Sequence, residues 1–146
     1  YSQRNMGGIT VNSKRRGIVA KEVFRIAYPK TGAEKKKWAK EYGMNAYYAG
    51  KHWALRKKDA ELWHWLTLAA MNAQDVRRTP FKQPVAVTFY WNDRLDIDNH
   101  AIMGKMIVDA MKGRVIEDDN RRWLKSVSHN FHDEDYIQVE IREVRP

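Results

Sequence analysis

The chain has 146 residues, a length that suits one domain with a sizeable hydrophobic core. Its 27 lysines and arginines outnumber its 18 aspartates and glutamates, and the net charge of +9 favours a polyanionic partner such as DNA or RNA over an anionic membrane. Cysteine is absent, so disulfides and thiolate metal sites are excluded, and oxygen or imidazole must hold any metal. No long apolar segment or secretory signal pattern is visible, so we expect a cytoplasmic protein.

The first third of the chain predicts an arm, a strand and a weak helix. Residues 1–20 are polar and basic, which predicts an N-terminal arm ahead of a domain over residues 21–146. The β-branched and aromatic run Val23–Tyr28 predicts a strand, and Ala33–Tyr42 predicts a weak, exposed helix. Two glycines bracket Gly43–Gly50, which we expect to be an aromatic-rich loop.

The middle of the chain predicts the main elements of the core. Helical spacing begins at Arg56 and predicts one buried face, formed by Leu62, Trp65, Leu66, Ala69, Ala70 and Ala73. The near-continuous apolar run Val85–Trp91 predicts a strand covered on both faces. Apolar residues at helical intervals in Asn99–Met111 predict the second main helix.

The last third predicts two more strands. Arg121–Ser128 is one, and in Tyr136–Val144 apolar residues alternate with polar ones, as in a half-buried strand with one wet face. The expected fold class is α+β, a single small domain with a mixed β-sheet of about four strands packed against two main helices.

Carboxylates flank the second main helix. Asp96 and Asp98 precede it, and Glu117–Asp119 follows it. On a helix that advances about 100° per residue, Asp98, Lys105 and Asp109 fall within about 40° of one another. Three carboxylates offer the hard oxygen ligands that suit Mg²⁺ or Mn²⁺, and a nearby lysine can offset charge that grows on a phosphate. In so basic a chain, this set indicates a centre that cuts phosphodiester bonds.

The same residues also have structural interpretations. Asp98 can cap the helix that begins at Asn99, and Lys105 can form an i,i+4 pair with Asp109. The alternative function is therefore a non-catalytic, basic nucleic-acid-binding protein with a structural acidic cluster. Its acidic groups would be salt-bridged to neighbouring arginines, namely Arg94, Arg114, Arg121 or Arg122.

The pattern resembles that of the RusA-type Holliday-junction resolvases, common in phages and prophages. The matching features are Asp96-Ile97-Asp98-Asn99, Lys105, Asp109-Ala110, Gly113 and Ile116-Glu117-Asp118-Asp119. The resemblance covers mainly Pro84–Val144, and Tyr47–Trp63 is also similar to phage members. It implies a homodimeric, Mg²⁺-dependent endonuclease that makes paired nicks in four-way DNA junctions and leaves 5′-phosphate and 3′-hydroxyl ends.

The resemblance also implies the roles of individual residues. Asp96, Asp98 and Asp119 would hold Mg²⁺, for which Mn²⁺ is a possible substitute, and Lys105 would stabilise the transition state. Asp118 is an alternative or additional ligand. The interval from Asp98 to Lys105 is about one helical turn longer than in the best-known member. Other branched DNA, or RNA, is an alternative substrate.

Junctions are recognised by shape and phosphate backbone more than by base edges. The candidate phosphate contacts are the basic residues Lys51, His52, Arg56, Lys57, Lys58, Arg121 and Arg122. Tyr47 and Tyr48 are candidates for stacking at the crossover, whereas Trp53 is expected to pack inside the protein. His100 is expected at the surface where the helix starts. Three other histidines show no spacing typical of a metal site: His64, His129 and His132.

Overall fold

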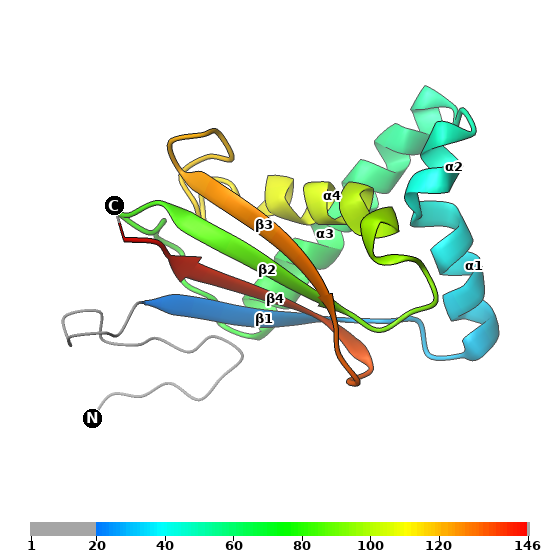
Figure 1. Cartoon of the computed structure of the whole chain (residues 1–146), viewed down its shortest axis with the longest axis horizontal. Coiled ribbons are helices and arrows are strands. Elements are labelled where there is room, and N and C mark those ends of the chain that lie inside the picture. The colour runs from blue at the N-terminus through cyan, green and yellow to red at the C-terminus, as the bar shows by residue number, and fades with distance from the viewer. Residues whose placement is uncertain (1–19, 146) are drawn as a thin grey trace.

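A mixed four-stranded sheet with strand order β1-β4-β2-β3 carries the fold (Figure 1). This computed structural model describes residues 20–145. β1 (Lys21–Ala27) and β2 (Val85–Trp91) each pair antiparallel with β4 (Tyr136–Glu143), and β2 pairs parallel with β3 (Leu124–Phe131). Three strands, β1, β2 and β3, therefore run in one direction, and their carboxyl ends lie at the same edge of the sheet.

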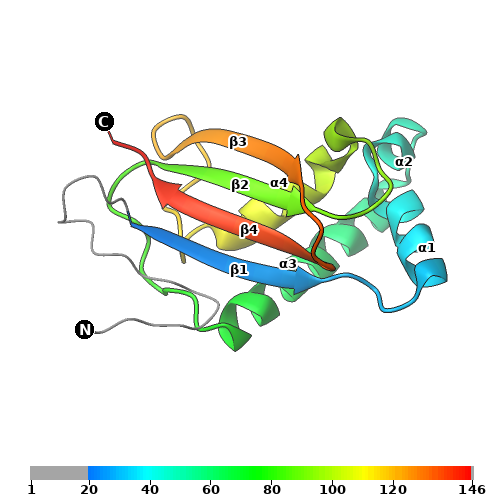
Figure 2. The same ribbon diagram turned by 60° about the horizontal axis from the view of Figure 1, so that its bottom comes forward.

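Helices lie on one face of the sheet and at this edge (Figure 2). α3 (Trp53–Ala73) and α4 (Ala101–Met111) pack against each other behind the sheet. α1 (Gly32–Tyr42) and α2 (Met44–Tyr48) stand at the edge where β1 and β2 end, and the 3₁₀ turn η1 (Ile97–His100) leads into α4. The prediction of an α+β domain with a mixed sheet and two main helices is confirmed.

None of the helices in the described part of the chain is both long and apolar enough to span a membrane. The arm predicted for residues 1–20 falls, apart from its last residue, outside the residues that the structure describes.

The core lies between the sheet and the two main helices. Val87, Phe89 and Trp91 of β2 are fully buried on that side, whereas Thr88 and Tyr90 on the opposite face remain partly exposed. The prediction that this strand is covered on both faces was therefore wrong, because α3 and α4 lie on the same side of the sheet (Figure 1). The alternating burial predicted for the last strand is confirmed in β4.

The predicted buried face of α3 was also wrong in part. Trp63, Thr67 and Met71 are buried at intervals of one turn, whereas Leu62 and Trp65 are 40% and 64% exposed. α3 is apolar over a wide arc, so its periodicity does not show which part of that arc faces the sheet. A polar residue enters the core because the Thr67 hydroxyl donates to the Trp63 carbonyl at 2.7 Å.

Three element boundaries differ from the predictions. The segment expected to be an aromatic-rich loop contains the short helix α2. α3 begins earlier than Arg56, because Nδ1 of His52 accepts a hydrogen bond from Ala54 N–H at 3.1 Å and caps the helix. β3 begins later than predicted, because a turn precedes Leu124.

α4 approaches the sheet closely at Gly104. A Cβ atom at this position would lie 3.0 Å from Cε1 of His129 and 3.2 Å from Cε2 of Phe89. Neither ring is free to move away, because His129 stacks on Phe89 and on Trp91. Glycine is the residue that lets this helix lie against β2 and β3 at that depth.

Replacing Gly104 with valine should lower the free energy of unfolding by about 1–3 kcal/mol, because the added carbons overpack the core. Urea unfolding at neutral pH measures the change. Gly32→Ala is the control, since a Cβ there meets nothing within 4 Å. Alanine at Gly32 should leave stability unchanged or raise it by up to about 1 kcal/mol. Equal stability of the two variants would show that Gly104 is not a close-packing position.

Candidate active site

The chain turns after β2 and carries two unpaired carboxylates there. Asp96 precedes η1 and Asp98 lies within it. Both residues are exposed, and neither carboxylate makes a hydrogen bond or ion pair with another described residue. The alternative capping role of Asp98 is not observed, because His100 stands at the cap position of α4 and Asp98 makes no capping bond. Two adjacent acceptors therefore remain available to a cation.

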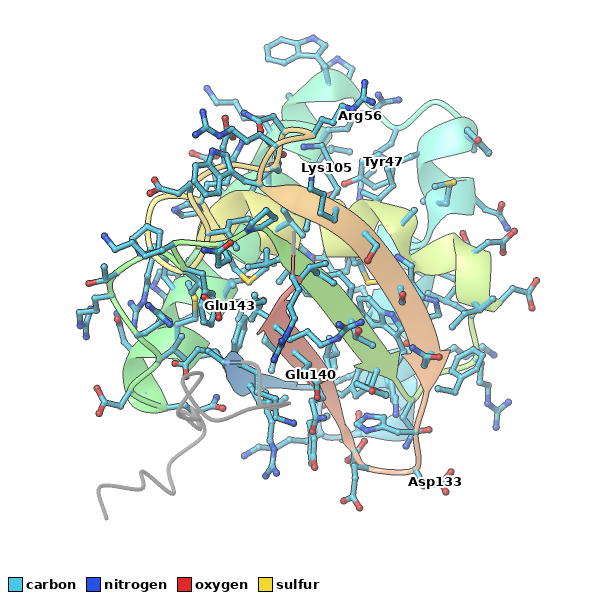
Figure 3. The ribbon with its side chains drawn as sticks, turned by 60° about the vertical axis from the view of Figure 1, so that its left-hand side comes forward. Tyr47, Arg56, Lys105, Asp133, Glu140 and Glu143 are labelled. Atoms are coloured by element: carbon cyan, nitrogen blue, oxygen red, sulfur yellow. The ribbon has the colours of Figure 1, made fainter. Side chains whose placement is uncertain are left out.

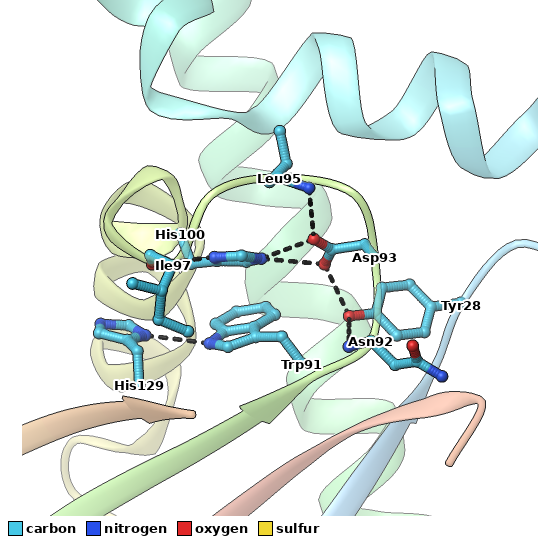
Figure 4. Close-up of polar contacts among 8 residues, drawn as sticks. All are labelled: Tyr28, Trp91, Asn92, Asp93, Leu95, Ile97, His100 and His129. Carbon is cyan, nitrogen blue, oxygen red and sulfur yellow. Dashed lines mark hydrogen bonds and ion pairs between the residues drawn. The ribbon is translucent and has the colours of Figure 1, made fainter. Parts of the chain in front are cut away.

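A buried ion pair joins the two ends of this turn (Figure 4). Nε2 of His100 lies 2.8 Å and 3.0 Å from the two carboxylate oxygens of Asp93, and its Nδ1 lies 3.0 Å from the Ile97 carbonyl oxygen. The His100 and Asp93 side chains are 0% and 1% exposed. The prediction of a surface histidine was wrong, because the ring is buried and both of its nitrogens lie within hydrogen-bond distance of oxygens inside the protein.

The carboxylate of Asp93 also accepts hydrogen bonds from the end of β1 and from the turn. The Tyr28 hydroxyl donates to it at 2.8 Å and Leu95 N–H donates at 3.0 Å, while Asn92 N–H donates to the Tyr28 oxygen at 2.7 Å. Burial alone raises the pKa of Asp93, but hydrogen bonds from His100 and Tyr28 and the charge of His100 outweigh it, so the pKa lies below its ordinary value. Burial raises the pKa of Tyr28, which keeps its hydroxyl a donor.

Aromatic rings connect this ion pair to the edge strand β3. Trp91 stacks on His100 with ring centroids 4.5 Å apart, and its Nε1–H donates to Nδ1 of His129 at 3.0 Å (Figure 4). Burial lowers the pKa of His129, which keeps that nitrogen free to accept. His129 thus orients a core tryptophan.

A further contact attaches the turn to the helices at the sheet edge. Asn99 Oδ1 accepts a hydrogen bond from Asn45 N–H at 3.1 Å. Gly43 allows this approach, since a Cβ there would lie 3.1 Å from Cδ2 of Leu95 and 3.0 Å from the Ala39 carbonyl oxygen. The asparagine of the Asp-x-Asp-Asn segment therefore joins the turn to the start of α2.

Two lysines and two aspartates form an ion-pair network between α4 and the loop that follows it. Lys105 Nζ lies 2.9 Å from Asp109 and 3.5 Å from Asp119, and Lys112 Nζ lies 3.5 Å and 3.6 Å from the same two carboxylates. The hydrogen bond and charge of Asp109, with the charge of Asp119, raise the pKa of Lys105. Burial raises the pKa of Asp119, but Lys112 and Lys105 outweigh it and the net shift is downward. Lys105 is therefore cationic and held beside Asp119.

The four predicted catalytic residues thus form two pairs. Asp96 and Asp98 share one turn, and Lys105 and Asp119 share an ion pair, but no hydrogen bond or ion pair joins one pair to the other among residues 20–145. Within that range no three His, Asp or Glu side chains are grouped closely enough to hold a metal ion. Mg²⁺ commonly takes only one or two protein carboxylates, with waters and substrate phosphates completing its shell. Two unpaired carboxylates fit that donor set.

The arginines of the structural alternative do not neutralise these carboxylates. Arg94, Arg121 and Arg122 form no ion pair with any other residue of the described range. Arg114 donates to backbone carbonyls, among them that of Val76 at 2.8 Å. The pairing with arginines that the alternative function would involve is therefore not observed within residues 20–145, and lysines are the partners of Asp119.

Three of the predicted phosphate contacts hold the α2–α3 junction together. Lys51 Nζ lies 2.5 Å from the buried carboxylate of Asp59 and donates to the Glu41 carbonyl at 2.8 Å. Arg56 Nε donates to the Lys51 carbonyl at 2.8 Å, and His52 caps α3. The remaining four are exposed and make no ion pair within the described range, namely Lys57, Lys58, Arg121 and Arg122.

The aromatic residues at this junction differ from the predictions. The Tyr47 hydroxyl donates to Asp59 at 2.5 Å, so this side chain belongs to the junction itself. Tyr48 and Trp53 are 82% and 71% exposed, and the expectation that Trp53 packs inside was wrong. Exposed aromatic rings beside free cations are typical of surfaces on which bases stack.

Removing the charge of Asp93 should destabilise the protein in a pH-dependent way. Because the folded-state pKa of Asp93 lies below 3.8, its contribution is complete above that value and is lost as the pH falls through the folded pKa. We expect Asp93→Asn to cost about 3 kcal/mol at neutral pH, with a difference from wild type that shrinks below about pH 4. Urea unfolding from about pH 7 to about pH 3 measures it.

Asp133→Asn is the matched control, because Asp133 lies exposed in the turn between β3 and β4 and makes no hydrogen bond or ion pair with the rest of the described chain (Figure 3). Its effect on stability should be small at every pH. A loss for Asp93→Asn that stayed constant down to about pH 3 would contradict a depressed pKa.

Comparison with known proteins places this site in a family. No curated protein matches the chain. The family model described as endodeoxyribonuclease RusA matches residues 8–142, a range that includes both acidic segments, Lys105 and the basic residues from 51 to 58. That match covers nearly the whole chain, and the protein therefore belongs to the RusA family of endodeoxyribonucleases.

Proposed function

We propose that this protein is a metal-dependent, structure-selective endonuclease that resolves four-way DNA junctions by paired phosphodiester nicks. Family membership supports cleavage of DNA. The observation that carries the chemistry is the exposed, unpaired carboxylate pair of Asp96 and Asp98 on a turn with a buried frame. The two carboxylates lie two residues apart in the sequence and have no cationic partner within the described residues, so both are available to a cation.

In this proposal Asp96 and Asp98 hold Mg²⁺, or Mn²⁺ in its place, and Asp119 is the third protein ligand. When bound, the cation polarises the phosphodiester and lowers the pKa of water for in-line attack. Asp119 now faces Lys105 and Lys112, which compete with a cation for its oxygens. Asp96 and Asp98 meet no such competition and form the part of the site that is ready to bind.

Lys105 is the cationic group of the proposed mechanism. Its side chain is 63% exposed, and its raised pKa keeps the ammonium charged at neutral pH. Ion pairs with Asp109 and Asp119 hold the long side chain on the exposed side of α4. From there the ammonium donates to a phosphate oxygen and stabilises the negative charge that grows in the transition state.

Paired nicks need two sites, so a homodimer is part of the proposal, with one site for each of two strands. Sequence-independent contacts to the backbone would come from the free cations Lys57, Lys58, Arg121 and Arg122. Tyr48 and Trp53 supply exposed rings on which unpaired bases at a crossover can stack.

Asp98→Asn should bind a labelled four-way junction at least as tightly as wild type, because it removes negative charge beside the phosphates, yet cut it at least about 100-fold more slowly with Mg²⁺. Gel assays of product and fluorescence anisotropy without Mg²⁺ separate the two effects. Asp133→Asn removes the same charge from an exposed residue outside the proposed ligand set, and it should bind and cut like wild type.

Undiminished cleavage by Asp98→Asn would remove Asp98 from the mechanism. If wild type bound the junction but gave no metal-dependent product, the non-catalytic alternative would replace the proposed function.

Lys105→Ala should reduce the rate of cleavage by about 10²–10³-fold with little change in junction binding, because its ammonium acts on charge that develops only in the transition state. Lys112→Ala is the matched control, since Lys112 contacts the same two carboxylates of the same ion-pair network. Single-turnover cleavage measures both. An equal loss in the two variants would assign the effect to the network and not to Lys105.

A further inference from the structure

A groove lies between α1 and the turn that follows β2. Its volume is about 820 Å³, and its walls come from α1, from the start of α2 and from the segment Asn92–Leu95 with Asn99. Leu95, which precedes Asp96, and Asn99, which follows Asp98, both line the groove. The groove therefore lies next to the segment that carries the two aspartates. None of the basic residues considered so far as phosphate contacts lines it.

Four cationic residues and one acidic residue line this groove, and the acidic residue already has hydrogen-bond partners inside the protein. Asp93 is that acidic residue, and its carboxylate is buried against His100 and Tyr28. Lys35 is partly committed as well, because its Nζ lies 3.3 Å from Asp135 and 4.2 Å from the centroid of the Tyr28 ring. The other three make no ion pair with any residue in the described range, namely Lys36, Lys40 and Arg94.

The rest of the lining suits an extended chain with regularly spaced negative charges. Three of the lining residues are small, namely Ala39, Gly43 and Ala46, and leave room for a ligand. The Asn45 side chain has no partner among the described residues, and its amide can donate to a phosphate oxygen. Cations and apolar residues that line one groove resemble the surfaces that bind single nucleic-acid strands, where the backbone follows the charges and bases lie on apolar groups.

We propose that this groove between α1 and the acidic turn binds the backbone of one DNA strand through Lys36, Lys40 and Arg94 and leads that strand to Asp96 and Asp98. The assignment rests on the proposed nuclease function and extends it by locating the path of the substrate. It also gives α1 a purpose, since this helix buries little and carries a run of lysines on its surface.

The side of α1 that faces the groove can be separated from the rest of the helix by mutation. Lys36→Ala/Lys40→Ala removes two groove cations. Lys30→Ala/Lys37→Ala removes the same charge from exposed positions in the same part of the chain that do not line the groove. All four lysines are exposed, so both double variants should fold like wild type.

Anisotropy with a labelled four-way junction, over a range of salt concentrations and without Mg²⁺, gives the affinity and its salt dependence. The groove variant should bind about tenfold or more weakly at moderate salt, with the log-log slope reduced by nearly 1 for each lost phosphate contact. The control variant should keep the slope of wild type. Cleavage by the groove variant should recover at high protein concentration, because Asp96 and Asp98 are intact.

A second measurement uses the absence of cysteine from the chain. Ala39→Cys introduces one thiol in the lining of the groove, and Ala73→Cys introduces one at the end of α3, outside the groove. Each thiol is labelled with an aryl azide photocrosslinker. Under illumination with the junction, the derivative at position 39 should crosslink to DNA and that at position 73 should not.

The outcomes separate this assignment from the function on which it rests. If wild type and both double variants bind and cut alike, or if position 39 does not crosslink, the groove assignment is wrong while the nuclease proposal stands. If wild type neither binds nor cuts the junction, both are wrong. Selective loss in the groove variant together with the crosslink supports the assignment.

Discussion

The carboxylate of Asp93 accepts hydrogen bonds from Tyr28 at the end of β1, from Leu95 in the turn after β2 and from His100 at the start of α4. A buried carboxylate is stable only while its partners remain in place, because each partner offsets part of the cost of removing the charge from water. One side chain therefore joins the turn after β2 and the start of α4 to the end of β1, which is distant in sequence. The turn between Asp93 and His100 is held at both ends, and this gives Asp96 and Asp98 a defined position without any bond to their own carboxylates.

The aspartates of this region differ in their partners more than in their place in the sequence. Asp93 is paired with histidine inside the protein, Asp109 and Asp119 are paired with lysines on the surface of α4, and Asp96 and Asp98 are unpaired. Only the last two combine exposure with a rigid frame. In the proposed metal site, a backbone that is held in place before the cation arrives would lose little conformational entropy on binding, which is the usual advantage of preorganisation.

The positive charge of the chain is divided in a similar way. Lys51 and Arg56 support the α2–α3 junction and Arg114 binds backbone carbonyls, so these cations stabilise the fold. A second set is exposed and makes no ion pair within the described residues, namely Lys36, Lys40, Lys57, Lys58, Arg94, Arg121 and Arg122. Electrostatic attraction of a polyanion depends on this second set, because a charge already neutralised by a near neighbour contributes little at a distance.

The sequence by itself determined the α+β class, the order of the main elements, the alternating burial of β4 and the family pattern, because periodicity and motif spacing are local properties. It also placed Asp96 and Asp98 at the end of an apolar strand. Tertiary structure alone decided which part of the α3 arc is buried, why Gly104 is a glycine, and that His100 lies inside against Asp93. Tertiary structure also placed α1 opposite the acidic turn, and the groove lies between them. Each of these features depends on contacts between residues that are far apart in the chain and meet only when strands and helices pack. Local patterns in a single sequence do not specify such contacts.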